Sequence, residues 1–246
     1  MKKKVLILMV SVLSVFLIVG TSLADNIRPV AGTSSTDFTT LQNAFNTLGL
    51  SFNAYSDQST AAYFTKTGEG STVTYIFSST YDAYAGSYEI GVYDSDGTAL
   101  KLWDNNTGLV VGSYVSVAWN TAGWAASTYY KPGTGSILVD ETQGLDSTNF
   151  GFYFDSVYGT MYSDDAKNSG NAQMLTFDGA KTGLSNYWFI AMEGATNNGD
   201  YPYSESNIDF DDMIVKVESI KPVPEPATLL LLGLGLLGIG IARRKS

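Results

Sequence analysis

The stretch SYEIGVYDSDGTALKLW, residues 87–103, contains the local pattern that decides the fold. Two short runs of aromatic and branched apolar residues flank the pair Asp96-Gly97. An Asp-Gly pair in this setting is typical of a tight turn between antiparallel strands, because glycine adopts the left-handed backbone conformation that such a turn needs. The segment therefore predicts a β-hairpin, with strands at 87–93 and 98–103.

The same turn, Asp94-Ser95-Asp96-Gly97, also matches the first half of an EF-hand calcium loop. Such a loop needs a glutamate six places after its glycine, and Trp103 stands there instead. The hairpin is therefore favoured over a calcium loop at this position.

Comparable runs rich in Val, Ile, Tyr, Phe and Thr follow along most of the chain, separated by Gly, Asn, Asp and Ser. We expect further strands at residues 72–78, 114–119, 137–139, 149–154, 174–177, 187–192 and 213–218. Many short strands at fairly regular spacing predict a mainly β fold, a β-sandwich or a jelly roll. We expect one domain over residues 25–221; the alternative is a division near Gly144 into two smaller sandwiches.

One short helix is predicted ahead of the strands. Its apolar residues recur at the spacing of one helix face, at Phe38, Leu41, Phe45 and Leu48. Thr36 or Asp37 would cap its start, and Gly49 would end it.

The N-terminal end has the order of a secretion signal. Three lysines, residues 2–4, precede an apolar run that extends to Val19, and Ser22-Leu23-Ala24 supplies the small residues of a cleavage site. We therefore predict a signal peptide over residues 1–24, removed by signal peptidase before Asp25.

The C-terminal end has three parts in a fixed order. The residues Val223-Pro224-Glu225-Pro226 come first, an apolar run over 227–242 follows, and Arg243-Arg244-Lys245 comes last. Two prolines within three residues cannot continue a helix or a central strand, so this motif should be extended and accessible. The apolar run predicts a transmembrane helix, and the basic residues would retain its end on the cytoplasmic side.

These three parts together closely resemble the PEP-CTERM sorting signal of bacterial exported proteins. The resemblance implies that an exosortase, a membrane protease-transferase, recognises the Pro-Glu-Pro region of an inner-membrane-anchored precursor. The protein would then reach the cell surface or the exopolysaccharide matrix. A permanent single-span anchor is the alternative interpretation of the same tail.

Charge and composition exclude several classes of function. The two end segments contain six of the 14 basic residues and none of the 24 acidic ones, so residues 25–226 have a net charge of −16. Nucleic acid is not expected as a partner, because binding phosphates needs a basic face. The chain contains no Cys and no His, which excludes disulfides, Cys/His zinc sites and Cys- or His-based nucleophilic catalysis. Calcium, which takes oxygen ligands, suits this composition.

The densest acidic cluster lies between residues 193 and 212, just ahead of the last predicted strand. Carboxylates crowded together repel one another, and a bound Ca²⁺ would remove that cost. Segments from Asn149 to Ser219, ending in Asp209-Phe210-Asp211-Asp212-Met213-Ile214-Val215, resemble a bacterial extracellular domain family of unknown function that often precedes PEP-CTERM tails. On this basis Glu193, Asp209 and Asp212 are the candidate metal ligands; a solvated acidic loop is the alternative.

Aromatic side chains suggest a second kind of site. Trp124, Tyr129 and Tyr130 lie in a stretch rich in Gly, Ala and Ser, and rings on such a loop would be available to stack on sugars. A core position is the alternative for each of them.

No recognisable catalytic motif is present in the sequence, although a carboxylate-based glycoside hydrolase needs only two suitably spaced acids. We therefore expect a non-catalytic, structural or adhesive protein of the cell surface or exopolysaccharide matrix. A carbohydrate-binding module is the second hypothesis and a hydrolase the third.

Overall fold

The computed structural model describes residues 38–77, 88–104, 110–119, 124–133, 135–146, 148–156, 159–169, 172–194 and 210–223, with the backbone alone at 124–127 and 135–144. All of them belong to one compact unit, Arg28–Val223. The predicted signal peptide and the predicted transmembrane helix of the tail lie outside the described residues. Among the described residues, no helix is both long enough and apolar enough to cross a membrane.

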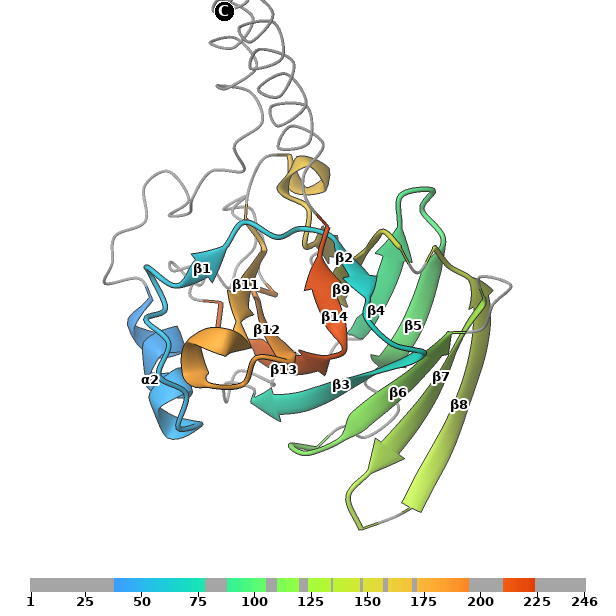
Figure 1. Ribbon diagram of the computed structural model, residues 1–246, viewed down its shortest axis with the longest axis horizontal. Coiled ribbons are helices and arrows are strands. Elements are labelled where there is room, and N and C mark those ends of the chain that lie inside the picture. Colours follow the sequence, from blue (N-terminus) through green and yellow to red (C-terminus); the bar gives the residue numbers. More distant parts are fainter. Residues whose placement is uncertain are drawn as a thin grey trace, which may run out of the picture. The chain divides into compact units, whose positions relative to one another are not determined.

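Two antiparallel sheets account for most of this unit (Figure 1). The larger sheet has eight strands in the order β1-β11-β12-β13-β3-β6-β7-β8. In chain order these are β1 (Gln58–Ser59), β3 (Gly70–Phe77), β6 (Tyr114–Trp119), β7 (Trp124–Lys131), β8 (Gly135–Gly144), β11 (Met174–Asp178), β12 (Tyr187–Met192) and β13 (Met213–Glu218).

The smaller sheet has the order β14-β2-β9-β4-β5, and β10 pairs with β9 beside this path. Its strands are β2 (Phe64–Lys66), β4 (Glu89–Asp94), β5 (Ala99–Asp104), β9 (Phe150–Ser156), β10 (Gly159–Tyr162) and β14 (Ile220–Pro222). Two short 3-10 helices, η2 (Asp165–Asn168) and η3 (Gly179–Thr182), lie in the connections.

The two sheets share one buried core. The Phe64 ring of the smaller sheet meets the Trp188 ring of the larger one edge-on, with centroids 5.2 Å apart. Across the same interface the Phe150 and Trp119 rings are tilted by 31° to each other, with centroids 5.3 Å apart. Alternate residues point into this core along strands such as β6 and β9, with Val115, Val117 and Trp119 on one and Phe150, Phe152 and Phe154 on the other, as expected for sheets that bury one face. The prediction of a mainly β fold is confirmed, and the two antiparallel sheets are consistent with a β-sandwich.

A second core lies on the outer face of the larger sheet. The helix α2 (Thr39–Thr47) buries Leu41, Ala44 and Phe45 there, beside β11 and β12 (Figure 1). The Phe45 ring meets that of Phe177 edge-on, with centroids 4.9 Å apart. The short helix is therefore confirmed, and it covers only the part of this face near β11 and β12.

The ends of α2 differ from the prediction in part. Phe38 stands at the N-cap without a side-chain hydrogen bond, and the expected caps, Thr36 and Asp37, lie outside the described residues. Gly49 does end the helix, since its φ of +69° is a conformation that suits glycine.

The central hairpin is confirmed. Gly97 has a φ of +86° between β4 and β5. The Asp94 carboxylate is buried and accepts hydrogen bonds from the backbone N–H groups of Asp96, Thr98 and Asp146. Asp94 therefore serves the turn itself, in agreement with the preference for a hairpin over a calcium loop.

Five strands lie outside the segments predicted as strands, namely β1, β2, β7, β10 and β14. Residues 124–131 were expected to form a loop, but as β7 they pair with β6 on one side and β8 on the other. Residues 220–222 follow the last predicted strand; the chain turns at Ser219, where φ is +60°, and enters the smaller sheet as β14. Strand β14 pairs with residues far away in the sequence, whereas β7 pairs with its two sequence neighbours although its Ala- and Ser-rich start gives only a weak strand pattern.

Candidate functional site

Glu193 and Asp212 lie together where β12 ends and β13 begins. Met192 pairs with Met213 at the end of this antiparallel pair of strands. Glu193 follows Met192 and Asp212 precedes Met213, so the two acidic residues lie next to each other. The Glu193 carboxylate is fully buried, and its Oε2 accepts a hydrogen bond of 3.1 Å from the backbone N–H of Phe210. The Asp212 carboxylate accepts a hydrogen bond from the backbone N–H of Gly194. We call this reciprocal arrangement of Glu193, Gly194, Phe210 and Asp212 the carboxylate clasp.

The clasp holds Phe210 in an unusual conformation. Its φ is +57°, which a residue with a side chain adopts at some cost in free energy. The Phe210 ring is fully buried and stacks on the Phe38 ring, with centroids 5.9 Å apart and an angle of 10° between the ring planes. The buried carboxylate of Glu193 and this ring contact together stabilise the conformation.

The structure describes two of the three predicted metal ligands. Glu193 and Asp212 are neighbours, each bound to a backbone amide, while Asp209 lies outside the described residues. In the described segments, no three Asp, Glu, Cys or His side chains form a group that could hold a metal ion. Calcium binding at this position stays a prediction.

The predicted stacking residues differ from one another in position. Tyr129 is fully buried in the core between the sheets, where its hydroxyl donates to Ser113 Oγ over 3.2 Å, so its ring is not available as a platform. The Trp124 side chain lies outside the described residues. Tyr130 is partly exposed and stacks on the exposed ring of Tyr114, with centroids 4.6 Å apart and 18° between the planes.

Tyr114 and Tyr130 belong to the part of the larger sheet's outer face that α2 does not cover. Their neighbours Val115 and Tyr129 point into the core, so the pair points the other way. We call this the open face. It is defined by the outward side chains of β13, β3, β6 and β7, namely Lys216, Thr72, Thr74, Tyr114, Ser116, Thr128 and Tyr130.

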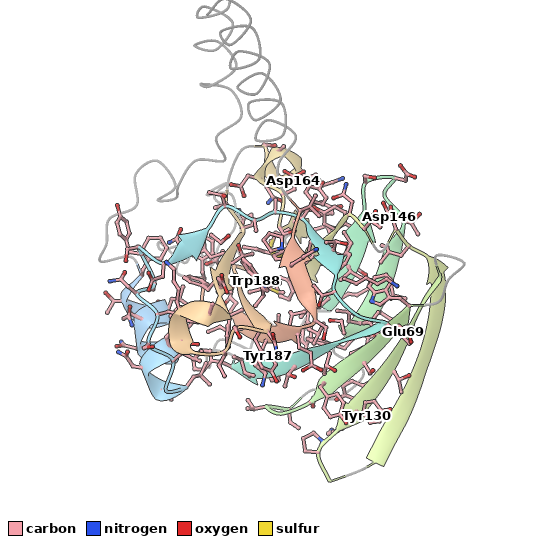
Figure 2. All side chains as sticks on the ribbon, in the orientation of Figure 1. Glu69, Tyr130, Asp146, Asp164, Tyr187 and Trp188 are labelled. Carbon is pink, nitrogen blue, oxygen red and sulfur yellow. The ribbon has the colours of Figure 1, made fainter. Side chains whose placement is uncertain are left out.

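Figure 2 shows Tyr130 on the β6–β7–β8 side of this sheet and Tyr187 on the β12–β13 side. The Lys216 ammonium lies 4.7 Å from the centroid of the Tyr187 ring, a cation–π contact at the edge of the open face. Sequence reasoning did not select Tyr114. The alternation of Tyr114 and Ser116 with Val115 and Val117 was the available signal, since it predicts which side chains face outward.

A cluster of tyrosines lies near η2, where Figure 2 shows Asp164. The Tyr63 hydroxyl donates a hydrogen bond of 2.8 Å to Asp164 Oδ2. Burial is the main reason that the pKa of Tyr63 is raised to about 12, and burial also raises the pKa of Tyr93. Lys167 Nζ lies 5.0 Å from the centroid of the Tyr93 ring and 5.3 Å from that of Tyr162. Tyr63 and Tyr93 are therefore neutral at ordinary pH, and the contacts of the cluster are those of packed side chains.

The last described strand leads directly into the tail. Strand β14 pairs with β2, and the Val223 N–H donates a hydrogen bond of 2.9 Å to the Tyr63 carbonyl oxygen. Residues 222–245 match the model of the PEP-CTERM protein-sorting motif. The tail is a PEP-CTERM sorting signal. The recognition of this motif from the sequence is therefore confirmed.

The PEP-CTERM motif implies an exported protein, made as a membrane-anchored precursor, with an exosortase as its processing partner. It begins at Pro222, the last residue of β14, so the sorting signal starts where the folded unit ends. A search of curated proteins and a search of solved structures each found no match. The resemblance of residues 149–219 to an extracellular domain family stays a prediction.

Proposed function

We propose that this protein is a non-catalytic component of the cell surface or of the exopolysaccharide matrix, with a structural or adhesive role. An exosortase would sort it and remove its tail. The observation that carries the proposal is the position of the sorting motif, which starts at Pro222, the last residue of the final strand of the folded unit. A cut in this motif would release the folded unit intact.

The exit of the chain supports this processing step. The backbone of Val223 is still hydrogen-bonded to Tyr63, so the folded unit is anchored up to the residue before Pro224. Pro224 and Pro226 cannot extend the ladder of β14, because proline lacks the N–H group that a strand donates. On this argument the Pro-Glu-Pro motif would not continue the sheet, and an exosortase would find it accessible.

Mass spectrometry of the protein from its native host tests the proposal. The surface-released form should lack the peptides that contain Leu229 to Leu237. Replacing Glu225 with Ala in the sorting motif should leave a membrane-bound form that keeps its tail. Lys221→Ala, an exposed change in β14 just outside the matched motif, is the matched control and should be processed normally. An intact tail in the released wild-type protein would show that the tail is a permanent anchor.

Carbohydrate binding is the second candidate function, and the exposed Tyr114–Tyr130 stack favours it. Partly exposed aromatic rings can pack against the C–H faces of sugars. The Thr and Ser side chains beside these rings on the open face have hydroxyl groups that can hydrogen-bond to the sugar. Retention on an immobilised matrix polysaccharide should fall in Tyr114→Ala and in Tyr130→Ala. Val111→Ala, which removes an exposed apolar side chain outside the open face, should be retained like the wild type. Equal retention of all the variants would refute a role for the open face.

A hydrolase is the least favoured function. If the fold were a carboxylate-based glycoside hydrolase, incubation with the retained polysaccharide should generate new reducing ends. We expect none to form.

A further inference from the structure

A pocket of about 290 Å³ lies between the first turns of α2 and the turn at residues 53–56. Its lining includes Phe38, Asn43, Asn53, Tyr55 and Ser56. This volume lies at the lower end of the range for small-molecule sites, so the pocket would accommodate one small ligand. It belongs to the side of the molecule that α2 covers, and it shares no residue with the open face or with the carboxylate clasp.

The helix side and the turn side of the pocket are joined by one side chain. Gln42 Nε2 donates a hydrogen bond of 2.9 Å to the Phe52 carbonyl oxygen. Gln42 Oε1 accepts a hydrogen bond of 2.9 Å from the Ala54 N–H. Because one amide bonds to the backbone on both sides of residue 53, the turn is held at a fixed position against α2.

The turn itself is also preorganised. Asn53 Oδ1 accepts hydrogen bonds from the backbone N–H groups of Tyr55 and Ser56. The Asp57 carboxylate accepts a hydrogen bond from the Asn53 N–H over 2.8 Å and forms an ion pair with Lys181, also at 2.8 Å. A ligand would therefore meet a turn that is already ordered, which lowers the entropic cost of binding.

The lining combines one exposed aromatic ring with amide and hydroxyl groups. Tyr55 is 39% exposed, and its ring is held edge-on against the buried Phe38 ring, with centroids 5.8 Å apart. Asn43 and Ser56 are exposed at the same pocket. Within the described residues, every side chain that lines it is uncharged. A charged ligand would find no counter-ion there, whereas a neutral ligand with one apolar face and several hydroxyl groups would find a partner for each part.

We propose that this pocket binds a single neutral pyranose sugar. The C–H face of the sugar would pack on the Tyr55 ring, and its hydroxyl groups would hydrogen-bond to the side chains of Asn43, Asn53 and Ser56. The inference deepens the carbohydrate-binding candidate, on which it rests, by naming a second site and a single sugar unit as its ligand.

Saturation-transfer NMR of the full chain in detergent tests the pocket, with glucose, galactose, mannose and N-acetylglucosamine as the neutral probes and glucuronate as the charged one. At least one neutral sugar should bind, and glucuronate should bind more weakly. Tyr55→Ala should weaken the binding about tenfold, while Tyr55→Phe, which keeps the ring, should bind within about twofold of the wild type. Asn43→Ala should weaken the binding by a smaller factor.

Leu184→Ala, an exposed apolar change outside the pocket, should leave sugar binding unchanged. A melting curve for each variant shows whether it is folded, and Asn43→Ala provides the test if Tyr55→Ala is not folded. The proposal is overturned if none of the four neutral sugars binds, if glucuronate binds as tightly, or if Tyr55→Ala binds like the wild type. Export and tail removal should be normal in Tyr55→Ala, so failure of the pocket would leave the sorting proposal standing.

Discussion

Replacing Glu193 with Ala should destabilise the folded unit, because it removes the carboxylate that accepts the Phe210 N–H. The Glu193 carboxylate is fully buried and accepts the Phe210 N–H, so the variant leaves a buried amide without its charged acceptor. Hydrogen bonds to charged groups contribute about 1.5–3 kcal/mol. For a unit of this size, each kcal/mol lowers the melting temperature by about 2–4 °C. The expected decrease in Tm is therefore about 3–12 °C.

Circular dichroism melts of the purified full chain would measure this difference. Glu193→Gln should lose less stability, because its amide oxygen can still accept the hydrogen bond from Phe210. Glu69→Ala, which removes an exposed carboxylate, is the control and should stay within about 0.5 kcal/mol of the wild type. A Glu193→Ala variant that melts at the wild-type temperature would refute the conclusion that the clasp holds residues 193 and 210 together.

Three further predictions concern the core, alkaline pH and calcium. Gly91→Ala should cost about 1–3 kcal/mol, since its Cβ would overlap the Tyr153 ring and the Leu100 carbonyl oxygen, whereas Gly68→Ala has no neighbour closer than 3.8 Å and should melt near the wild type. The raised pKa of Tyr63 means that folding favours its protonated form. Its contribution to stability should be complete below pH ~10 and disappear as the pH rises through ~12, so in denaturant titrations across that range Tyr63→Phe should lose less stability than the wild type. Calcium at about 100 times its Kd should add roughly 2.7 kcal/mol if the acidic loop binds it. We expect a Tm several degrees higher in millimolar calcium than in chelator, and an unchanged Tm would leave Glu193 and Asp212 with their structural role alone.

Much of the fold was predictable because its signals are local. Strands β6, β12 and β13 have the predicted limits, since their branched and aromatic residues alternate or run together between clear breaks. The hairpin at Gly97 and the helix end at Gly49 follow from backbone conformations that glycine adopts most easily. The sorting motif was recognisable for a similar reason. It is defined by the order of prolines, apolar residues and basic residues along the chain and does not depend on tertiary contacts.

The sequence by itself thus determined the mainly β class, the short helix and the sorting tail, all of which depend on neighbours along the chain. Only the tertiary structure decided which side chains of those elements are buried. Tyr129 points into the core and Tyr130 away from it, because β7 is held in register between two strands. Glu193 was predicted to be a metal ligand or part of a solvated acidic loop, and only the pairing of β12 with β13 shows that it is buried against the backbone amide of Phe210. The alternation along a strand can indicate which side chains share a face, but which residues are buried depends on packing against residues far apart in the sequence.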